Sequence, residues 1–281
     1  MNRQQPPIVT PKNFENDVIA ATILKKLIAS DGDPIQYHLH TEEGLVLLND
    51  FIGQEIKIEF SGIIYCKRCG RQTKKSFSQG FCYPCFRSAP EASPCIIRPE
   101  LCEAHLGKGR DVDWEQRYHN QPHVVYLAAS SAIKVGVTQA AAVPTRWIDQ
   151  GASAAVIIAR TPHRQMAGMI EVELKKQFTD KTHWQKMLRN EVLEEVDFQE
   201  SFNIAKDSIP DELKDYLHLG ARLFKGRYPV AEYPNKVVSF NQEKYPSISG
   251  VLNGIKGQYL IFDASRVINI RKYQGYEVRI S

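Results

Sequence analysis

Long hydrophobic runs are missing from this sequence, in which no stretch approaches about 18 consecutive apolar residues. The first residues also lack the apolar run behind a basic segment that a secretory signal requires. These two absences argue against a helical membrane protein and predict a cytoplasmic protein that has no membrane partner. The composition is nevertheless that of a folded protein, because 43% of the 281 residues are hydrophobic and 24% are charged.

Acidic residues are absent between Phe60 and Ser88, although the whole chain has a net charge of only +4. The basic residues of this stretch are Lys67, Arg68, Arg71, Lys74, Lys75 and Arg87. Such a patch suits the phosphate backbone of nucleic acids, so we predict DNA or RNA as a partner, bound through the first five of these side chains. Aromatic residues interleave with them, either to stack on bases or to form the small core that a zinc segment needs.

Cysteine is scarce, and all six cysteines lie between Cys66 and Cys102. In a reducing compartment this clustering argues for metal binding and against disulfides. Four of them form the pattern Cys66-x2-Cys69-x12-Cys82-x2-Cys85, which is the spacing of a four-thiolate zinc site. Four unrelated buried thiols, the alternative, would not produce paired spacing. We predict that these four residues bind a structural zinc ion and occupy all of its coordination positions.

A second group of possible metal ligands follows the first. The residues are Cys95, Cys102, His105, His119 and His123. The first three and His119 could complete a second tetrahedral zinc site, and His123 is the other candidate for its fourth ligand. The alternative is that the cysteines are buried thiols and the histidines lie in loops. The prediction is therefore one or two structural zinc ions per chain.

Hydrophobic patterning divides the chain into four parts. They are an N-terminal helix and β-rich region (1–60), a zinc-binding module (61–122), a mixed core (123–205) and a C-terminal β-rich region (206–281). The helix is expected over Asp17–Ser30, where the apolar residues have helical spacing, and a strand over Gln54–Phe60, where they alternate. Each β-rich end is too short for a core of its own, so we expect the two ends to pack together.

The part of the chain from His123 has its own order of elements. Two β-branched runs around a small-residue turn predict a β-hairpin over 123–138. The elements expected next are a short helix over Pro144–Gln150, a buried strand over Ala154–Ala159, and helices over Pro162–Phe178, His183–Phe202 and Asp211–Leu219. The expected order is thus strand, strand, helix, strand and helix.

Short motifs within this order resemble the GIY-YIG nuclease superfamily. They are Val125-Tyr126-Leu127, Lys134-Val135-Gly136-Val137-Thr138, Arg146 and the helical segment Glu171–Lys176. The resemblance implies a ββαβα core whose catalytic residues are Tyr126, Lys134, Arg146 and Glu171. Tyr126 would act on the attacking water as base or relay, Arg146 would bind the phosphate, and Glu171 would hold magnesium. Lys134 stands where many members have a second tyrosine, and would contact phosphate or lower the pKa of Tyr126.

A wider part of the chain is similar to a bacterial family named domain of unknown function 2797. The stretches that carry this similarity are YCKRCGRQTKKSFSQGFCYPCF, PTRWIDQGA and NGIKGQYLIFD. Together the patterns predict an α+β protein in which a zinc ribbon precedes a GIY-YIG-like ββαβα core between β-rich ends. The first hypothesis for its function is a zinc-containing nucleic-acid-binding protein with magnesium-dependent endonuclease activity. The alternatives are a non-catalytic binding module with a degenerate nuclease fold, and a zinc-stabilised adaptor for protein interactions.

Overall fold

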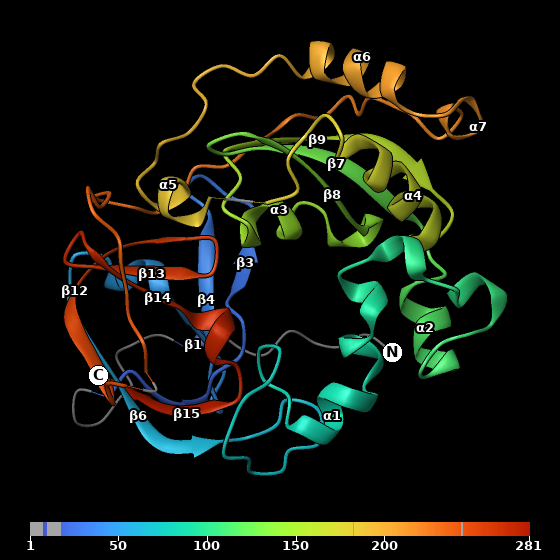
Figure 1. Cartoon of the computed structure of the whole chain (residues 1–281). Helices are drawn as coiled ribbons and strands as arrows, with labels where there is room; N and C mark the ends of the chain where they lie inside the picture. Colours follow the sequence, from blue (N-terminus) through green and yellow to red (C-terminus); the bar gives the residue numbers. More distant parts are fainter. Residues whose placement is uncertain (1–7, 10–17, 182, 243) are drawn as a thin grey trace. The chain divides into compact units, whose positions relative to one another are not determined.

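The structure is a computed structural model that describes residues 8–9, 18–181, 183–242 and 244–281 (Figure 1). The chain divides into two compact units. Unit 1 contains the described residues up to Phe86 together with Arg227–Ser281, and unit 2 contains Arg87–Gly226. Within the described ranges, no helix is both long and apolar enough to cross a membrane.

The main sheet of unit 1 joins strands from both ends of the chain. Its strands are β2 (Ala20–Ile23), β6 (Glu55–Ile64), β11 (Val238–Ser239), β12 (Ser247–Lys256), β13 (Tyr259–Phe262), β14 (Arg266–Asn269) and β15 (Tyr276–Ile280). Their order is β11-β14-β13-β12-β6-β15-β2, so that β6 lies between two C-terminal strands. The prediction that the two β-rich ends pack together is confirmed.

Strand β6 has the alternation that its sequence predicts. Ile56 and Ile58 are buried, and Lys57 between them is exposed. A smaller sheet has the order β1-β5-β4-β3, with β1 at Ile8–Val9, β3 at Ile28–Ser30, β4 at Gln36–His40 and β5 at Leu45–Leu47. Two 3-10 turns, η3 (Leu48–Phe51) and η9 (Ile270–Tyr273), also belong to this unit.

The helix predicted over Asp17–Ser30 is wrong. Asp17 lies outside the described residues, and the rest of the segment contains the strands β2 and β3. Side chains of β2 alternate between buried and exposed, which is the period of a strand. The strand pairs antiparallel with β15, so that Ala20 lies opposite Ile280. Pairing with the other end of the chain therefore overrides the local helical preference of alanine, leucine and lysine.

Unit 2 is built on an antiparallel sheet with two helices from the same part of the chain. The elements are β7 (His123–Ala129), β8 (Ile133–Gln139), α3 (Thr145–Asp149), β9 (Ala154–Thr161), α4 (Arg164–Leu174) and β10 (Phe224–Lys225). The sheet order is β10-β9-β7-β8, and every neighbouring pair is antiparallel. The predicted order of strand, strand, helix, strand and helix is confirmed.

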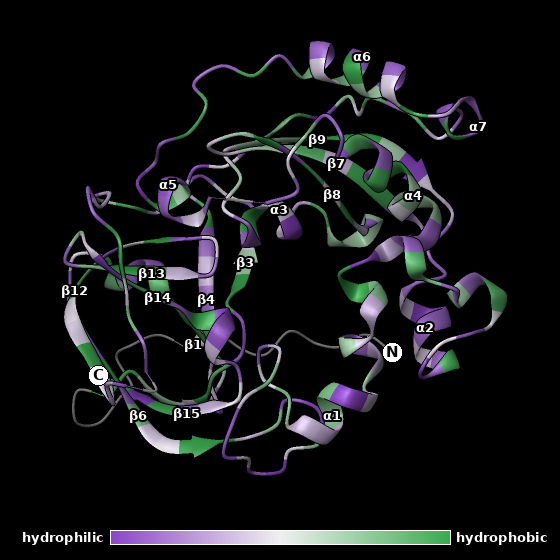
Figure 2. Cartoon of the chain, viewed as in Figure 1, coloured by the Kyte–Doolittle hydropathy of each residue, from purple (hydrophilic) through white to green (hydrophobic). Residues whose placement is uncertain are grey.

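Helix α4 and strand β7 form the centre of the core in unit 2. Ala167, Ile170 and Leu174, on one stripe of α4, are fully buried as their spacing predicts. All seven residues of β7 are buried, so both faces of this strand are covered. Helices α6 (Phe198–Ser208) and α7 (Asp211–Lys214) add further apolar side chains to this core. Figure 2 shows the hydrophobic colouring along β7 and the alternating colours along α6.

The single helix predicted over His183–Phe202 is wrong in its middle. Helix α5 (Trp184–Leu188) ends just before Asn190, whose φ of 57° lies in the left-handed region. Asp197 then begins α6, because its carboxylate accepts hydrogen bonds of 2.9 Å from two backbone N–H groups of the first turn. Capping chemistry at these two residues divides a segment whose apolar spacing alone suggests one helix.

Short turns and helices make up the remaining regular structure between β6 and α3. They are α1 (Tyr83–Ser88), η4 (Pro90–Ala92), η5 (Pro94–Ile96), η6 (Pro99–Leu101), η7 (Ala104–Leu106), α2 (Val112–Tyr118) and η8 (Ala140–Ala142). The predicted metal ligands after Cys82 all lie on or beside these short elements, except His123, which begins β7.

Candidate functional site

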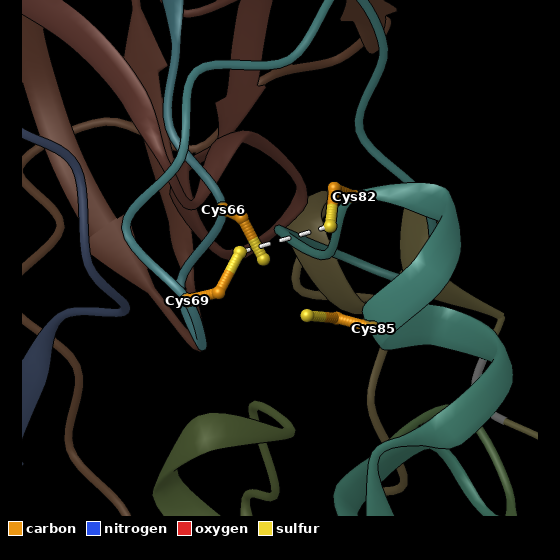
Figure 3. A group of neighbouring side chains, drawn as sticks. All are labelled: Cys66, Cys69, Cys82 and Cys85. Carbon is orange, nitrogen blue, oxygen red and sulfur yellow. Dashed lines mark hydrogen bonds between the residues drawn. The ribbon is translucent and has the colours of Figure 1, made fainter.

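The four cysteines of the predicted zinc ribbon come together in unit 1 (Figure 3). Their sulfur atoms lie within 4.8 Å of one another, and the Sγ atoms of Cys69 and Cys82 are 3.8 Å apart. Two zinc–sulfur bonds of about 2.3 Å at the tetrahedral angle also place sulfurs about 3.8 Å apart. Cys66, Cys82 and Cys85 are buried, and Cys69 is exposed. The arrangement is that of a zinc-ribbon-like knuckle pair.

Two tight turns direct the sulfurs to one point. After the first pair, the N–H of Gly70 donates to the carbonyl oxygen of Cys66 at 2.9 Å, and Gly70 has a φ of 70° that favours glycine. The second pair lies at the start of α1, where the N–H of Phe86 donates to the carbonyl oxygen of Cys82 at 2.9 Å. The sequence between the pairs folds back on itself through an antiparallel bridge. Local backbone geometry thus directs both cysteine pairs to one point.

Hydrogen bonds from the chain favour the thiolate form of two of these cysteines. The backbone N–H and the guanidinium of Arg71 lower the pKa of Cys69 to about 6. Burial alone would raise the pKa of Cys66, but backbone N–H groups, among them those of Cys69 and Cys82, together lower it. Because zinc binds thiolates, a lowered pKa reduces the cost of releasing the proton when the metal binds.

A groove lies beside the four-cysteine cluster in unit 1. It is lined by Arg71, Gln72, Thr73, Lys74, Lys75, Phe77, Cys82, Tyr83 and Pro84. The residues predicted to bind nucleic acid, Lys67, Arg68, Arg71, Lys74 and Lys75, are all exposed. The last three of them line the groove, so the predicted patch is partly concave and free of acidic side chains.

Aromatic residues of this segment divide between core and surface. Phe81 is only 2% exposed, and Nζ of Lys67 lies 4.1 Å from its ring centroid. Tyr83 is 55% exposed, and its ring meets that of Phe77 at an angle of 61° with the centroids 5.4 Å apart. Phe81 therefore supplies the small core of the segment, and Tyr83 presents a ring on which a base could stack.

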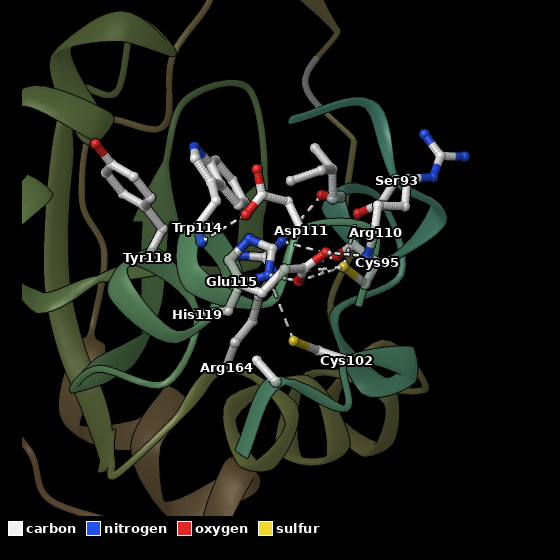
Figure 4. A network of polar contacts seen from close by, with 12 residues as sticks. Ser93, Cys95, Cys102, Arg110, Asp111, Trp114, Glu115, Tyr118, His119 and Arg164 are labelled. Atoms are coloured by element: carbon white, nitrogen blue, oxygen red, sulfur yellow. Dashed lines mark hydrogen bonds and ion pairs between the residues drawn. The ribbon is translucent and has the colours of Figure 1, made fainter. Parts of the chain in front are cut away.

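A second set of metal-ligating side chains comes together in unit 2 (Figure 4). Cys95, Cys102, Glu115 and His119 are buried, and each offers a donor atom within 4.8 Å of the others. Nδ1 of His119 lies 3.8 Å from Sγ of Cys95 and 3.5 Å from Sγ of Cys102. The same nitrogen is 2.7 Å from Oε2 of Glu115. Three of the four residues predicted for a second site are brought together, and a carboxylate takes the fourth place.

Neither His105 nor His123 belongs to this second cluster. The ring of His105 stacks on that of His163, with the centroids 4.2 Å apart. His123 is fully buried in β7, and burial lowers its pKa to about 4. Glu115 was not among the predicted ligands, which were cysteines and histidines only. A signal was present, since Glu115 and His119 are four residues apart and so share one face of α2.

The four predicted catalytic residues converge in unit 2 from four different elements. Tyr126 lies on β7, Lys134 on β8, Arg146 on α3 and Glu171 on α4. The charge of Arg146 acts on Tyr126 and on Lys134, and the charge of Glu171 acts on Tyr126. We call these four residues the Tyr126 cluster. The fold brings them together, because the first and the last of them are 45 positions apart in the sequence.

Tyr126 is held rigidly at the centre of its cluster. Its side chain is 1% exposed, and its hydroxyl accepts a hydrogen bond of 2.9 Å from the amide of Gln150. Burial raises its pKa, although Arg146 and Gln150 act in the opposite direction. On the paired strand β8, a Cβ at Gly136 would lie 2.6 Å from the Tyr126 hydroxyl oxygen. The glycine of the second motif thus makes room for the tyrosine of the first.

Two charged members of the Tyr126 cluster, Lys134 and Glu171, are also buried, and Arg146 is half-buried. Burial, reinforced by Arg146, lowers the pKa of Lys134 from 10.5 to about 7. Burial raises the pKa of Glu171. Oε2 of Glu171 forms an ion pair with Nζ of Lys175 at a distance of 3.2 Å. Arg164 was not predicted as a site residue. Its guanidinium donates to the carbonyl oxygen of Cys95 at 3.0 and 3.1 Å. Arg164 begins α4, the helix that carries Glu171.

The lowered pKa of Lys134 gives an expected pH dependence of stability. Between pH 7 and 10.5 the unfolded amine binds more protons than the folded one, so the free energy of unfolding contributed by Lys134 rises with pH. We expect the wild type to gain up to about 1.4 kcal/mol per pH unit relative to Lys134→Met between pH 7 and 9. Denaturant unfolding of both proteins at the two pH values measures this difference. Parallel curves for the two proteins would contradict it.

The model of the family described as "Protein of unknown function (DUF2797)" matches residues 53–278, which include both cysteine clusters and the Tyr126 cluster. No curated protein and no solved structure matches the chain. Because the match spans most of the sequence, this chain belongs to the DUF2797 family.

Proposed function

We propose that this protein binds nucleic acid through the basic groove of unit 1 and cleaves phosphodiester bonds at the Tyr126 cluster of unit 2. The observation that carries the proposal is the convergence of Tyr126, Lys134, Arg146 and Glu171 from four elements. Together with β9, these four elements follow the order strand, strand, helix, strand and helix that the resemblance to GIY-YIG nucleases implies. The four-cysteine centre, loaded with zinc, would hold the basic segment in place without taking part in the chemistry.

Cleavage of a phosphodiester requires a base, a phosphate ligand and a means to stabilise the charge of the transition state. Lys134 suits the first role, because a pKa of about 7 leaves much of the amine neutral at physiological pH. Tyr126, whose pKa is raised, stays protonated and would orient the water or the phosphate through its hydroxyl. Arg146 suits the phosphate, because a guanidinium can bind two oxygens at once.

Magnesium is the metal that Glu171 would hold. A single carboxylate is typical of magnesium sites, in which the ion keeps several waters, and Glu171 offers a hard oxygen ligand. The ion would replace Lys175 as the partner of this carboxylate. When bound, it would supply charge to stabilise the departing oxygen of the phosphodiester.

A cleavage assay tests this proposal. Labelled single-stranded, duplex and branched DNA and RNA are incubated with the wild type, Glu171→Gln and Glu173→Gln, with and without magnesium. Glu173 is the matched control, because it lies on the same helix and is paired with Lys176. We expect magnesium-dependent cleavage by the wild type and by Glu173→Gln, and a loss of at least about a hundredfold in Glu171→Gln. Equal cleavage by all three proteins would assign the activity to a contaminant or to another site.

A second candidate function is binding without cleavage. The groove with Arg71, Lys74, Lys75 and the exposed ring of Tyr83 favours it, since these features need no chemistry to hold a nucleic acid. The test is the salt dependence of affinity for the wild type and a variant with alanine at the three basic positions. A control variant with alanine at the exposed residues Lys236, Lys244 and Lys272 removes the same charge elsewhere in unit 1. Unchanged affinity in the groove variant would remove both functions.

A further inference from the structure

The segment from Ala89 to Pro122 folds with almost no hydrophobic core. It consists of four 3-10 turns and the short helix α2, and it contains no strand. Its own cluster of buried hydrophobic residues is Cys95, Cys102 and Ala104. Larger apolar side chains of the segment are exposed instead, and Ile97 is 82% exposed. A segment of this length without a core needs another source of folding free energy, which a bound metal ion can supply.

The donor atoms at the centre of this segment have the spacing of a metal site. Zinc bonds of about 2.3 Å to sulfur and about 2.0 Å to nitrogen place a tetrahedral sulfur–nitrogen pair about 3.5 Å apart. Nδ1 of His119 is 3.5 Å from Sγ of Cys102 and 3.8 Å from Sγ of Cys95. The contact of 2.7 Å between Nδ1 of His119 and Oε2 of Glu115 is a hydrogen bond. A small movement of the two side chains would let both atoms bind one shared ion. Figure 4 shows the four side chains directed toward one another.

The orientation of His119 argues for a metal centre and against a catalytic triad. In a cysteine–histidine–carboxylate triad, one ring nitrogen faces the sulfur and the other faces the carboxylate. Here Nδ1 alone faces both sulfurs and the carboxylate. His119 is 3% exposed and Cys102 is 2% exposed, whereas reactive cysteines are partially exposed.

The surroundings of the cluster are built to hold an anionic ligand set. The hydroxyl of Ser93 lies 3.0 Å from Sγ of Cys95, and the N–H of Arg110 donates to Oε1 of Glu115. The guanidinium of Arg164, which is bound to the carbonyl oxygen of Cys95, adds a half-buried positive charge nearby. A Cβ at Gly109 would lie 2.7 Å from Cδ of Glu115, so only glycine leaves room for the carboxylate. Such outer contacts fix the orientation of metal ligands.

We propose that Cys95, Cys102, Glu115 and His119 bind a second zinc ion as a closed structural centre that replaces a hydrophobic core in this segment. Four protein ligands leave no open position, and the ion joins the turns η5 and η6 to α2. Two contacts carry its effect to α4: Arg164 holds the backbone of Cys95, and Gly168 touches the backbone of Glu100 in η6 so closely that no Cβ fits. If the proposed function holds, this zinc ion also steadies Glu171, one turn further along α4.

Two measurements on the full-length protein test the second centre without any nucleic acid or activity. The first is zinc content per chain, for which we expect two ions in the wild type and in His105→Ala. We expect one ion in Cys102→Ser. The second is X-ray absorption of the zinc-loaded wild type, which needs no variant and reports the ligands directly. Four sulfurs in one centre and two in the other average three sulfurs and one nitrogen or oxygen per zinc.

The outcomes separate the possible ligand sets. One zinc per chain with four sulfur ligands in the wild type would overturn the proposal, whatever the variants do. Two zinc ions in Cys102→Ser would also overturn it. Loss of the second ion in His105→Ala but not in Glu115→Gln would replace the carboxylate by His105 and overturn the ligand set. Retention in His105→Ala together with loss in Glu115→Gln would support the set that the geometry indicates. None of these results depends on whether the Tyr126 cluster cleaves nucleic acid.

Discussion

Serine in place of Cys82 is expected to unfold residues 65–86 and to leave the main sheet of unit 1 folded. The segment has little else to hold it together, because Phe81 and the three buried cysteines provide most of its interior and its pairing is limited to isolated bridges. Structural zinc contributes about 10 kcal/mol or more to the folding of such modules, which exceeds what a few hydrogen bonds can replace. The neighbouring strands β6, β12 and β15 have an apolar core of their own.

Hydrogen exchange resolved by peptide measures this local unfolding. Peptides covering residues 65–86 should lose protection in Cys82→Ser and in the wild type after chelation, while those covering β6 and β12 keep it. Lys74→Gln, a change of an exposed residue in the same segment, is the control and should exchange like the wild type. Equal protection in Cys82→Ser and Lys74→Gln would mean that the cysteine cluster does not stabilise the segment.

Alanine in place of Gly275 is expected to destabilise unit 1 by more than about 3 kcal/mol. Gly275 has a φ of 89°, and a Cβ there would overlap the carbonyl oxygen of Tyr65. Neither group can move easily, because the N–H of Tyr65 donates to Gly275 at 2.7 Å and the N–H of Gly275 donates to Leu24 at 2.8 Å. The change would push apart the chain segments at Leu24, Tyr65 and Gly275. Because Tyr65 directly precedes Cys66, loss of zinc affinity should accompany the loss of stability.

Gly53 provides the matched control for this prediction. Its φ of 86° is nearly the same, but nothing lies within 4 Å of the position that a Cβ would occupy. Gly53→Ala should therefore cost only the backbone strain of about 1 to 2 kcal/mol. Urea unfolding of the two variants, followed by the signal of unit 1, separates strain from overlap. A Gly275→Ala protein as stable as Gly53→Ala would show that the close approach to Tyr65 relaxes without cost.

Predictions from the sequence succeeded where a local pattern has one structural solution. The two Cys-x-x-Cys pairs require their turns, and the alternation of Ile56, Lys57 and Ile58 requires a strand, so both were found. The helix predicted for the segment before Ser30 was wrong because the apolar spacing of the segment fits a helix. Its strand β2 instead pairs with β15, which lies at the other end of the chain. No local pattern reports such a partner. The break before Asp197 was missed because capping by a side chain was not weighed against apolar periodicity.

Predictions of site residues depended on local patterns in the same way. Tyr126, Lys134, Arg146 and Glu171 were predicted from short motifs, and the fold brings them near one another. Glu115 was missed, since a single glutamate near cysteines is common and only the turn of α2 places it beside His119. Arg164 was missed for a similar reason, because its role depends on a backbone carbonyl that lies 69 positions earlier in the chain.

The position of β6 between β12 and β15 has a consequence for synthesis on the ribosome. Both partners of β6 are translated after unit 2, so the hydrogen-bonding edges of this hydrophobic strand stay open while the intervening residues emerge. Unit 2, which is continuous in sequence, can fold first. The nascent chain therefore passes through a stage in which unit 2 is folded and unit 1 still lacks its C-terminal strands. A chaperone, or early metal binding at Cys66–Cys85, would have its largest effect at this stage.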